Sequence, residues 1–204
     1  MIWDISPLVE PRTAVWPGDT PFSSIENLSL REGDSVNLSE IRLSCHMGAH
    51  ADAPSHYLEG EPSIEEMPLE AYLGPCSLID VRPAGDEVRA EDVGSVKLLP
   101  RVLLRTQEKT ESTVFPAEFT ALTVDLVEAL AEAGVILVGL DSPSVDVFDS
   151  ADLPVHKALH RCGIANLECL QLDGVPTGNY ELVALPLRLQ GRDASPVRAV
   201  LRDL

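Results

Sequence analysis

A chain of 204 residues is long enough to bury a sizeable core and short enough to form one domain, which we expect over residues 1–204. The apolar fraction of 45% excludes a disordered chain. The formal net charge of −18 excludes the basic surface that nucleic-acid binding needs. No apolar run is long enough to span a membrane, and the N-terminus has no signal-peptide pattern, so we expect a cytoplasmic protein.

The four cysteines contain no C-x-x-C pair, so neither a zinc ribbon nor a disulfide framework is expected. We expect buried free thiols in a reducing compartment. The residues concerned are Cys45, Cys76, Cys162 and Cys169.

The first forty residues are rich in proline and turn formers, and the run Trp16-Pro-Gly-Asp-Thr-Pro21 predicts a tight turn. Trp16 stands at its start. From the residues alone, two interpretations stay open: Trp16 packs the N-terminal segment against the core, or it forms an aromatic wall of a pocket.

Apolar residues occupy every odd position from 41 to 53, and polar residues or glycine occupy every even one. This period of two predicts an extended segment with one buried face. His46, His50 and Asp52 share the other face. Fully extended, the Cα atoms of the two histidines would lie about 13 Å apart, too far to meet at one ion. The chain must therefore curl, and Gly48 is the residue that allows it.

The rest of the chain alternates short strands and helices. Helix 123–133 followed by buried strand 135–141, after strand 101–106, predicts a parallel strand-helix-strand unit. The other expected elements are helical turns over 63–73 interrupted by Pro68, strand 76–81, a helical turn over 90–93, a short helix ending at Gly163, and strands 164–168, 181–189 and 196–203.

The short helix places His156 and His160 on one face, four residues apart, and either can ligate a metal. Glu168 follows soon after, between Leu167 and Cys169. A carboxylate in such apolar surroundings is costly unless it is paired or binds a metal.

Histidine and carboxylate ligands suit Zn²⁺, Mn²⁺ or Fe²⁺, and without a cysteine cluster they favour a catalytic over a structural site. The alternative for His46, His50 and Asp52 is three ordinary polar residues on a solvated sheet face. His56 follows the cluster and is either a further ligand or a general acid/base.

The pattern H-x-G-x-H-x-D-x-P-x-H at 46–56 resembles the signature of the cyclase-like metal-dependent hydrolases. The opening Trp3-Asp-Ile-Ser-Pro, the segment Val15-Trp-Pro-Gly-Asp-Thr-Pro21 and the stretch 153–168 resemble the bacterial kynurenine formamidase (arylformamidase) branch. The resemblance covers about residues 1–203. It implies an α/β fold with a swivelling β/β/α arrangement, mixed β-sheets and a few short helices, in a homodimer.

The resemblance also implies two Zn²⁺ per subunit, with Mn²⁺ or another divalent metal as the alternative. His160 matches nothing in the family pattern. Two departures, Lys157 in place of a frequent histidine and Ala49 in place of a threonine, leave the ligands intact. The positions that match are His46, His50 and Asp52 for the first metal (Asp52 bridging), His156 for the second, Glu168 as a second bridge, His56 as proton donor and acceptor, and Trp16 as a substrate contact.

The reaction implied is hydrolysis of N-formyl-L-kynurenine, a small molecule, to L-kynurenine and formate in tryptophan breakdown. Two rival functions remain. One is another hydrolase of the same family that opens a cyclic amide or an isatin-like ring. The other is a metal-stabilised binding module without catalysis.

Overall fold

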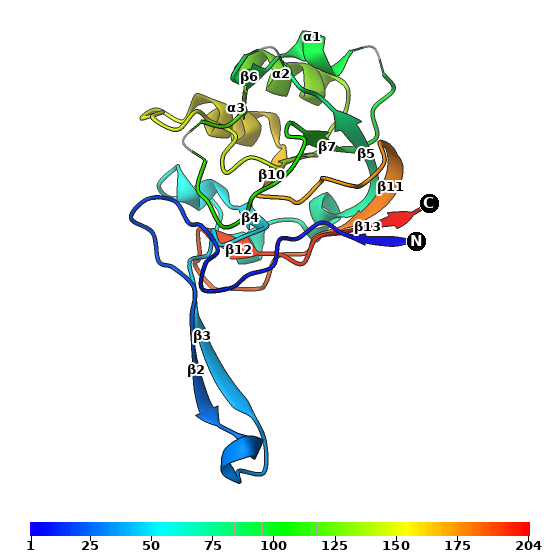
Figure 1. Ribbon diagram of the computed structural model, residues 1–204. Helices are drawn as coiled ribbons and strands as arrows, with labels where there is room; N and C mark the ends of the chain where they lie inside the picture. The colour runs from blue at the N-terminus through cyan, green and yellow to red at the C-terminus, as the bar shows by residue number, and fades with distance from the viewer. Residues whose placement is uncertain (84, 95, 117) are drawn as a thin grey trace.

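The computed structural model describes residues 1–83, 85–94, 96–116 and 118–204, and its main feature is a mixed sheet of nine strands (Figure 1). The first and last strands of the chain lie side by side at one edge, and β4 and β12 form the other edge. In spatial order the strands are β1 (Ile2–Asp4), β13 (Val200–Asp203), β11 (Gly178–Val183), β5 (Leu73–Asp80), β7 (Arg101–Arg105), β9 (Leu137–Leu140), β10 (Ala165–Glu168), β4 (His50–Asp52) and β12 (Ala194–Pro196).

The centre of the sheet is parallel and its edges are antiparallel. Strands β5, β7, β9 and β10 run parallel, and Arg101 pairs with Leu137 between β7 and β9. The predicted parallel strand-helix-strand unit and the predicted mixed sheet are therefore confirmed. Strand β4 joins β10 antiparallel, with His50 opposite Glu168. This pairing brings two polar segments, more than a hundred residues apart in sequence, to one place.

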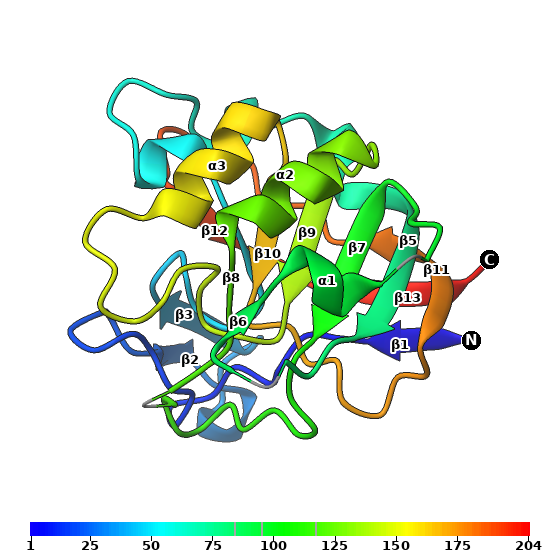
Figure 2. The ribbon, with the colours of Figure 1, turned by 90° about the horizontal axis from the view of Figure 1, so that it is seen from above.

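Three helices cover one face of the sheet: α1 (Ala90–Val93), α2 (Val124–Glu132) and α3 (Pro154–Cys162), as Figure 2 shows. The central strands alternate their side chains between two cores, as the period of two requires. Val102 and Leu104 belong to the core beneath the helices, whereas Leu103 belongs to the core on the opposite face. Single turns of 3₁₀ helix complete the fold: η1 (Leu30–Glu32), η2 (Pro54–His56), η3 (Ile64–Glu66) and η4 (Leu69–Tyr72).

The extended segment predicted over 41–53 is two strands. Strand β3 (Leu38–Arg42) ends before the first histidine, and β4 begins at His50. Between them Gly48 has φ = 62°, so the predicted curl at this glycine is confirmed. A Cβ atom here would lie 3.1 Å from Val9 Cγ2, which is a second reason for glycine at this position.

A β-hairpin that was not predicted from the sequence extends away from the body of the molecule (Figure 1). It consists of β2 (Ser23–Leu28) and β3, with η1 between the strands, and every residue of both strands is exposed. A ribbon with neither face buried has no one-sided hydrophobic pattern, so the alternation rule cannot detect it.

Other boundaries also differ from those predicted. The strand expected over 181–189 is β11, which ends at Val183. The strand expected over 196–203 is limited to β13, which begins at Val200. Strand β12 was not predicted. A small parallel pair, β6 (Glu87–Val88) and β8 (Ala121–Leu122), was also missed.

All four cysteines are free, as predicted, but only Cys76 is buried. No helix in the described ranges is long and apolar enough to cross a membrane. One domain over 1–204 stays a prediction.

Gly139 in β9 tests how tightly the central sheet is packed. A Cβ atom there would lie 2.6 Å from Leu103 Cδ2 and 2.9 Å from Leu170 Cδ1. We expect Gly139→Ala to lower the free energy of unfolding by about 1–3 kcal/mol, because the added methyl group overpacks the core. Urea unfolding measures this. Gly85→Ala, with open space around its Cβ, is the matched control. Equal unfolding midpoints for both variants would contradict the packing argument.

Candidate metal centre

Three elements bring histidines and carboxylates together at one end of the sheet. Strand β4 carries His50 and Asp52, β10 carries Glu168, and the first turn of α3 carries His156. All four side chains are buried. The sequence motif and the distant helix therefore meet at one place.

The first half of the centre lies on the curled segment. His50 Nδ1 donates a hydrogen bond to the carbonyl of Gly48 at 2.8 Å, so its Nε2 faces the carboxylates. This Nε2 atom lies 3.5 Å from Asp52 Oδ1, and His46 Nδ1 lies 3.0 Å from the same oxygen. The curl brings the two imidazole centroids to within 5.0 Å of each other.

The second half of the centre uses the other oxygen of each carboxylate. His156 Nε2 lies 3.5 Å from Asp52 Oδ2 and 3.5 Å from Glu168 Oε1. His50 Nε2, in turn, lies 3.5 Å from Glu168 Oε2. Asp52 and Glu168 thus each direct one oxygen toward His50 and one toward His156.

These positions fit metal ions better than they fit hydrogen bonds. A separation of 3.5 Å is long for a hydrogen bond, but two nitrogen or oxygen ligands on one tetrahedral zinc lie about 3.3 Å apart, because each bond is about 2 Å long. In the described part of the chain, His50 Nε2 and Asp52 Oδ1 are buried without a hydrogen-bond partner. The groups whose ligand atoms can surround an ion are His46–His50–Asp52, Asp52–His156–Glu168 and His46–His56–Asp193.

The electrostatics of the centre also favour a cation. Burial acts to lower the pKa of His156, but the hydrogen bond to Asp146 and the nearby carboxylates of Asp52 and Glu168 outweigh it and raise the pKa to about 12. Burial acts to raise the pKa of Asp52, yet His156 and His46 hold it well below its ordinary value. Carboxylates this close together stabilise positive charge between them, whether a proton or a metal ion carries it.

Two residues that the sequence analysis missed orient these ligands. Asp146 Oδ2 accepts a hydrogen bond from His156 Nδ1 at 2.7 Å, which directs Nε2 toward the carboxylates. Asn166 donates hydrogen bonds to Asp52 Oδ2 at 2.8 Å and to Glu168 Oε1 at 3.3 Å. Asn166 lies two residues before Glu168 in β10, so the period of two, which puts both on one face, could have identified it. Asp146 lies in a loop and has no such signal.

His56 lies at the edge of the centre, with about a third of its side chain exposed. Its ring centroid is 4.3 Å from that of His46, and its Nδ1 is 3.6 Å from Asp193 Oδ2. Burial lowers the pKa of His56. Asp193 also accepts a hydrogen bond from His46 Nε2 at 2.9 Å, a contact that the sequence analysis did not find. His160 lies apart from the cluster, 3.3 Å from Glu61.

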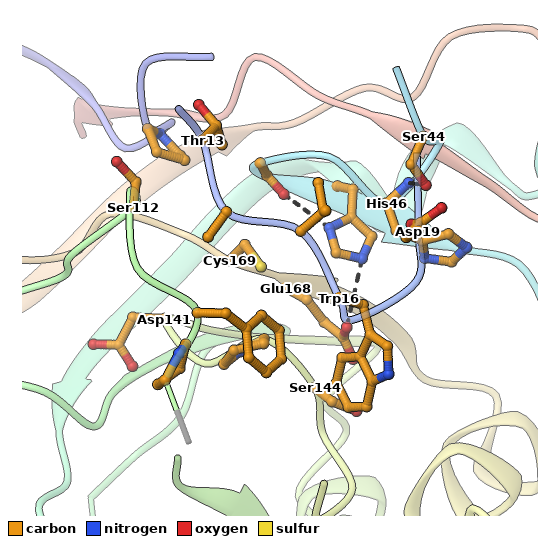
Figure 3. Close-up of a pocket in the computed structure, with 18 of the residues that line it drawn as sticks. Thr13, Trp16, Asp19, Ser44, His46, Ser112, Asp141, Ser144, Glu168 and Cys169 are labelled. Atoms are coloured by element: carbon orange, nitrogen blue, oxygen red, sulfur yellow. Dashed lines mark hydrogen bonds and ion pairs between the residues drawn. The ribbon is translucent and has the colours of Figure 1, made fainter. Parts of the chain in front are cut away.

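The centre opens into a cavity of about 860 Å³, and Figure 3 shows Trp16, His46 and Glu168 among its walls. Trp16 lines the cavity, and its ring partners lie outside the buried core. Its ring packs against Phe148 and Phe115, with centroids 5.1 and 5.3 Å away. The two phenylalanines were not identified from the sequence.

A cluster of histidines and carboxylates at the base of an open cavity, on this mixed sheet, defines a metal-dependent hydrolase. The fold matches "The Structure Of Potential Metal-Dependent Hydrolase With Cyclase Activity" with a TM-score of 0.85 and 29% identity, over 98% of this chain and 96% of that one. It also matches isatin hydrolase A from Labrenzia aggregata, bound to benzyl benzoate, with a TM-score of 0.84 and 26% identity, over 98% and 93% of the two chains.

The family model described as "Putative cyclase" matches residues 3–147, and the chain belongs to this family. A relative from Polaromonas naphthalenivorans (strain CJ2), named kynurenine formamidase, is 48% identical over 100% of this chain and 91% of its own length. Another of that name, from Bordetella petrii, is 47% identical over 100% of this chain and 98% of its own length.

Asp146 provides a test of how the helix that carries His156 is held. Its two oxygens accept the backbone N–H groups of Val155 and His156, each at 3.0 Å, in place of a side-chain cap on α3. We expect Asp146→Ala to lower the free energy of unfolding of the metal-free protein by about 1–3 kcal/mol. Thermal or urea unfolding measures this. Asp149→Ala, at an exposed position in the same loop, should change little, and equal losses would refute the capping role.

Proposed function

We propose that this protein hydrolyses N-formyl-L-kynurenine to L-kynurenine and formate in tryptophan breakdown, the reaction of an arylformamidase. The observation that carries the proposal is the near-half identity, over the whole chain, to two relatives named kynurenine formamidase. The buried histidine and carboxylate cluster beneath an open cavity supports it, because hydrolysis of a formamide needs an activated water and space for an aryl group. The cytoplasmic location stays a prediction.

Two divalent cations, Zn²⁺ or alternatively Mn²⁺, would be held by residues on both sides of the β4–β10 pairing. Asp52 and Glu168 would contribute to both sites, since each directs its two oxygens to different histidines. His46 and His50 would complete the first site and His156 the second. Bound there, the cations supply the positive charge that lowers the pKa of a water molecule and offsets the charge developing on the formyl oxygen.

His56 moves the proton. Its partly exposed ring lies on the cavity wall beside the first site, and its Nδ1 faces Asp193, so Nε2 is available to the substrate. A neutral imidazole accepts a proton from the attacking water, and the imidazolium donates it to the aromatic amine as the C–N bond breaks. Trp16 stacks on the aryl ring and orients the formamide toward the cluster.

A second candidate function is the opening of an isatin-like ring or another cyclic amide, favoured by the structural match to isatin hydrolase A at 26% identity. The two reactions need the same metal centre and differ in the shape of the substrate. A non-catalytic binding module is disfavoured, because its metal would not need an open cavity beside a partly exposed histidine. That module would unfold when the metal is removed and would hydrolyse no formanilide.

Turnover of N-formyl-L-kynurenine by the metal-loaded protein, followed by the absorbance of kynurenine, tests the proposed function. We expect His56→Ala to keep its metal and fold but to lower kcat by about 100- to 10,000-fold, because proton transfer is lost. The substrate panel includes isatin and a simple formanilide. Turnover of isatin alone would overturn the proposed function, and full activity in His56→Ala would overturn the role of His56.

Metal content tests the ligand assignment. Elemental analysis of the wild type should give two metals per chain. We expect His156→Ala to retain one, because His156 serves only the second site. His160→Ala, on the same helix beside Glu61, should retain both and is the matched control. Two metals in His156→Ala and one in His160→Ala would mean that the wrong histidine is assigned.

We further propose a homodimer formed through the β2–β3 hairpin. Ile25, Leu28 and Leu38 are 58%, 37% and 52% exposed, and the pairing of Ile25 with Glu40 and of Leu28 with Leu38 places all three on one face, with Glu40 and Arg42 beside them. A two-stranded hairpin with neither face covered is only marginally stable in water. Burying these apolar side chains against a partner would stabilise it. A second copy of the chain fits, since its hairpin carries the same apolar face.

Molar mass in solution tests this dimer. We expect the wild type to have twice the chain mass by light scattering, and the double variant Ile25→Glu/Leu38→Glu to be monomeric, because the charges oppose burial of that face. Glu26→Gln, on the opposite face of the ribbon, is the control and should remain dimeric. A monomeric wild type, or a dimeric double variant, would contradict the proposal.

A further inference from the structure

The cavity above the metal centre is acidic. Among the described residues that line it, none is lysine or arginine. A substrate arm that carries a positive charge would therefore meet neutral or negative side chains outside the metal centre, and no lysine or arginine among the described lining residues. The carboxylates that line the cavity are Asp19, Glu111, Asp141, Glu168 and Asp193.

Two of these carboxylates are bound within the centre. Glu168 faces His50 and His156, and Asp193 accepts a hydrogen bond from His46 at 2.9 Å. Neither is available to a distant part of the substrate without disturbing the histidine that it contacts.

Two other carboxylates already have hydrogen-bond or ion-pair partners in the loop after β7. Asp141 accepts hydrogen bonds from the hydroxyl of Thr106 at 2.6 Å and from its backbone N–H at 2.9 Å. Glu111 lies 3.7 Å from Lys109 Nζ and accepts a hydrogen bond from Thr113 Oγ1 at 3.1 Å. Their charges are already partly balanced.

Asp19 is different. Its Oδ1 accepts a hydrogen bond from the N–H of Thr20 at 2.6 Å, and no Lys, Arg or His in the described part of the chain lies within ion-pair distance of its carboxylate. The side chain is half-buried in the cavity wall (Figure 3). A half-buried carboxylate without a cationic partner is a natural binding site for a ligand cation.

The backbone fixes Asp19 relative to Trp16. The N–H of Asp19 donates to the carbonyl of Trp16 at 2.9 Å, and Gly18 between them has φ = 94°. Proline at the second position of this turn and a positive φ at the third are the features of a type II turn. One rigid turn thus presents an aromatic face and a carboxylate to the same cavity.

We propose that Asp19 is a specificity-determining residue that binds the ammonium group on the side arm of an aryl formamide substrate, while Trp16 holds the ring. The inference rests on the proposed function and names the feature of the substrate that the pocket selects. The pocket then favours aryl formamides with an ammonium-bearing arm over those without one. No bond is made or broken at Asp19, since the contact is an ion pair.

Substrate discrimination tests this inference in the metal-loaded protein. N-formyl-L-kynurenine is compared with its desamino analogue, in which hydrogen replaces the ammonium group and the ring, ketone, formamide and carboxylate are unchanged. We expect the wild type to prefer the ammonium substrate in kcat/KM by about tenfold, which is about 1.4 kcal/mol. Asp19→Asn should lose most of this preference through a higher KM for that substrate, with kcat little changed.

The design separates recognition from folding. Asparagine keeps an oxygen that accepts the Thr20 N–H, so the turn is retained. Glu111→Gln, a cavity carboxylate already paired with Lys109, is the matched control and should keep the wild-type preference. If Asp19→Asn does not fold, the ratio of the kcat/KM values of the wild type for the two substrates still tests the inference.

Two results would overturn the inference while the proposed function stands: equal kcat/KM values for the two substrates in the wild type, or an equal loss on both in Asp19→Asn. A wild type that hydrolyses neither substrate but opens isatin would instead overturn the proposed function, and this inference with it.

Discussion

The pairing of β4 with β10 imposes the constraint on which the rest of the molecule depends. It sets His50 opposite Glu168 and buries Asp52 beside them, so two carboxylates lie close together in the protein interior. Two such anions repel each other and lose their hydration, a cost of several kcal/mol that nearby positive charge must offset. The raised pKa of His156 has the same cause, because the nearby carboxylates stabilise positive charge on its ring. The stability of this buried cluster and its capacity to hold a metal ion therefore depend on one feature, the pair of buried carboxylates.

The surrounding sheet is built to hold this cluster rigidly. Ala49, Ala51 and Ala53 alternate with the polar residues of the curled segment and are all buried, so β4 lies close against its neighbours. Asp146 fixes both the start of α3 and the ring of His156. Such supporting hydrogen bonds determine which nitrogen of a histidine is free to ligate, and their loss weakens metal binding even when every ligand is present.

The sequence allowed much of this to be predicted, and the failures have physical causes. The span of about 13 Å between extended histidines required a curl, and Gly48 supplies it. The choice between His156 and His160 could not come from spacing, because both occupy one helix face, and it depended on the family resemblance. The hairpin was missed because it has no buried face, and Asp146 because a loop has no periodicity that reveals its contacts.

The metal centre alone does not explain which amide is hydrolysed, since the structural match to an isatin hydrolase extends over the same fold. Discrimination must come from the walls of the cavity, and these are supplied by segments outside the β4–β10 pairing. The turn from Trp16 to Asp19 is one such wall, held by its own backbone hydrogen bond. Because the turn is not part of the buried cluster, its side chains can change without exposing the carboxylates that need the cation. A fold arranged in this way can keep one chemistry and vary its substrate at the loops.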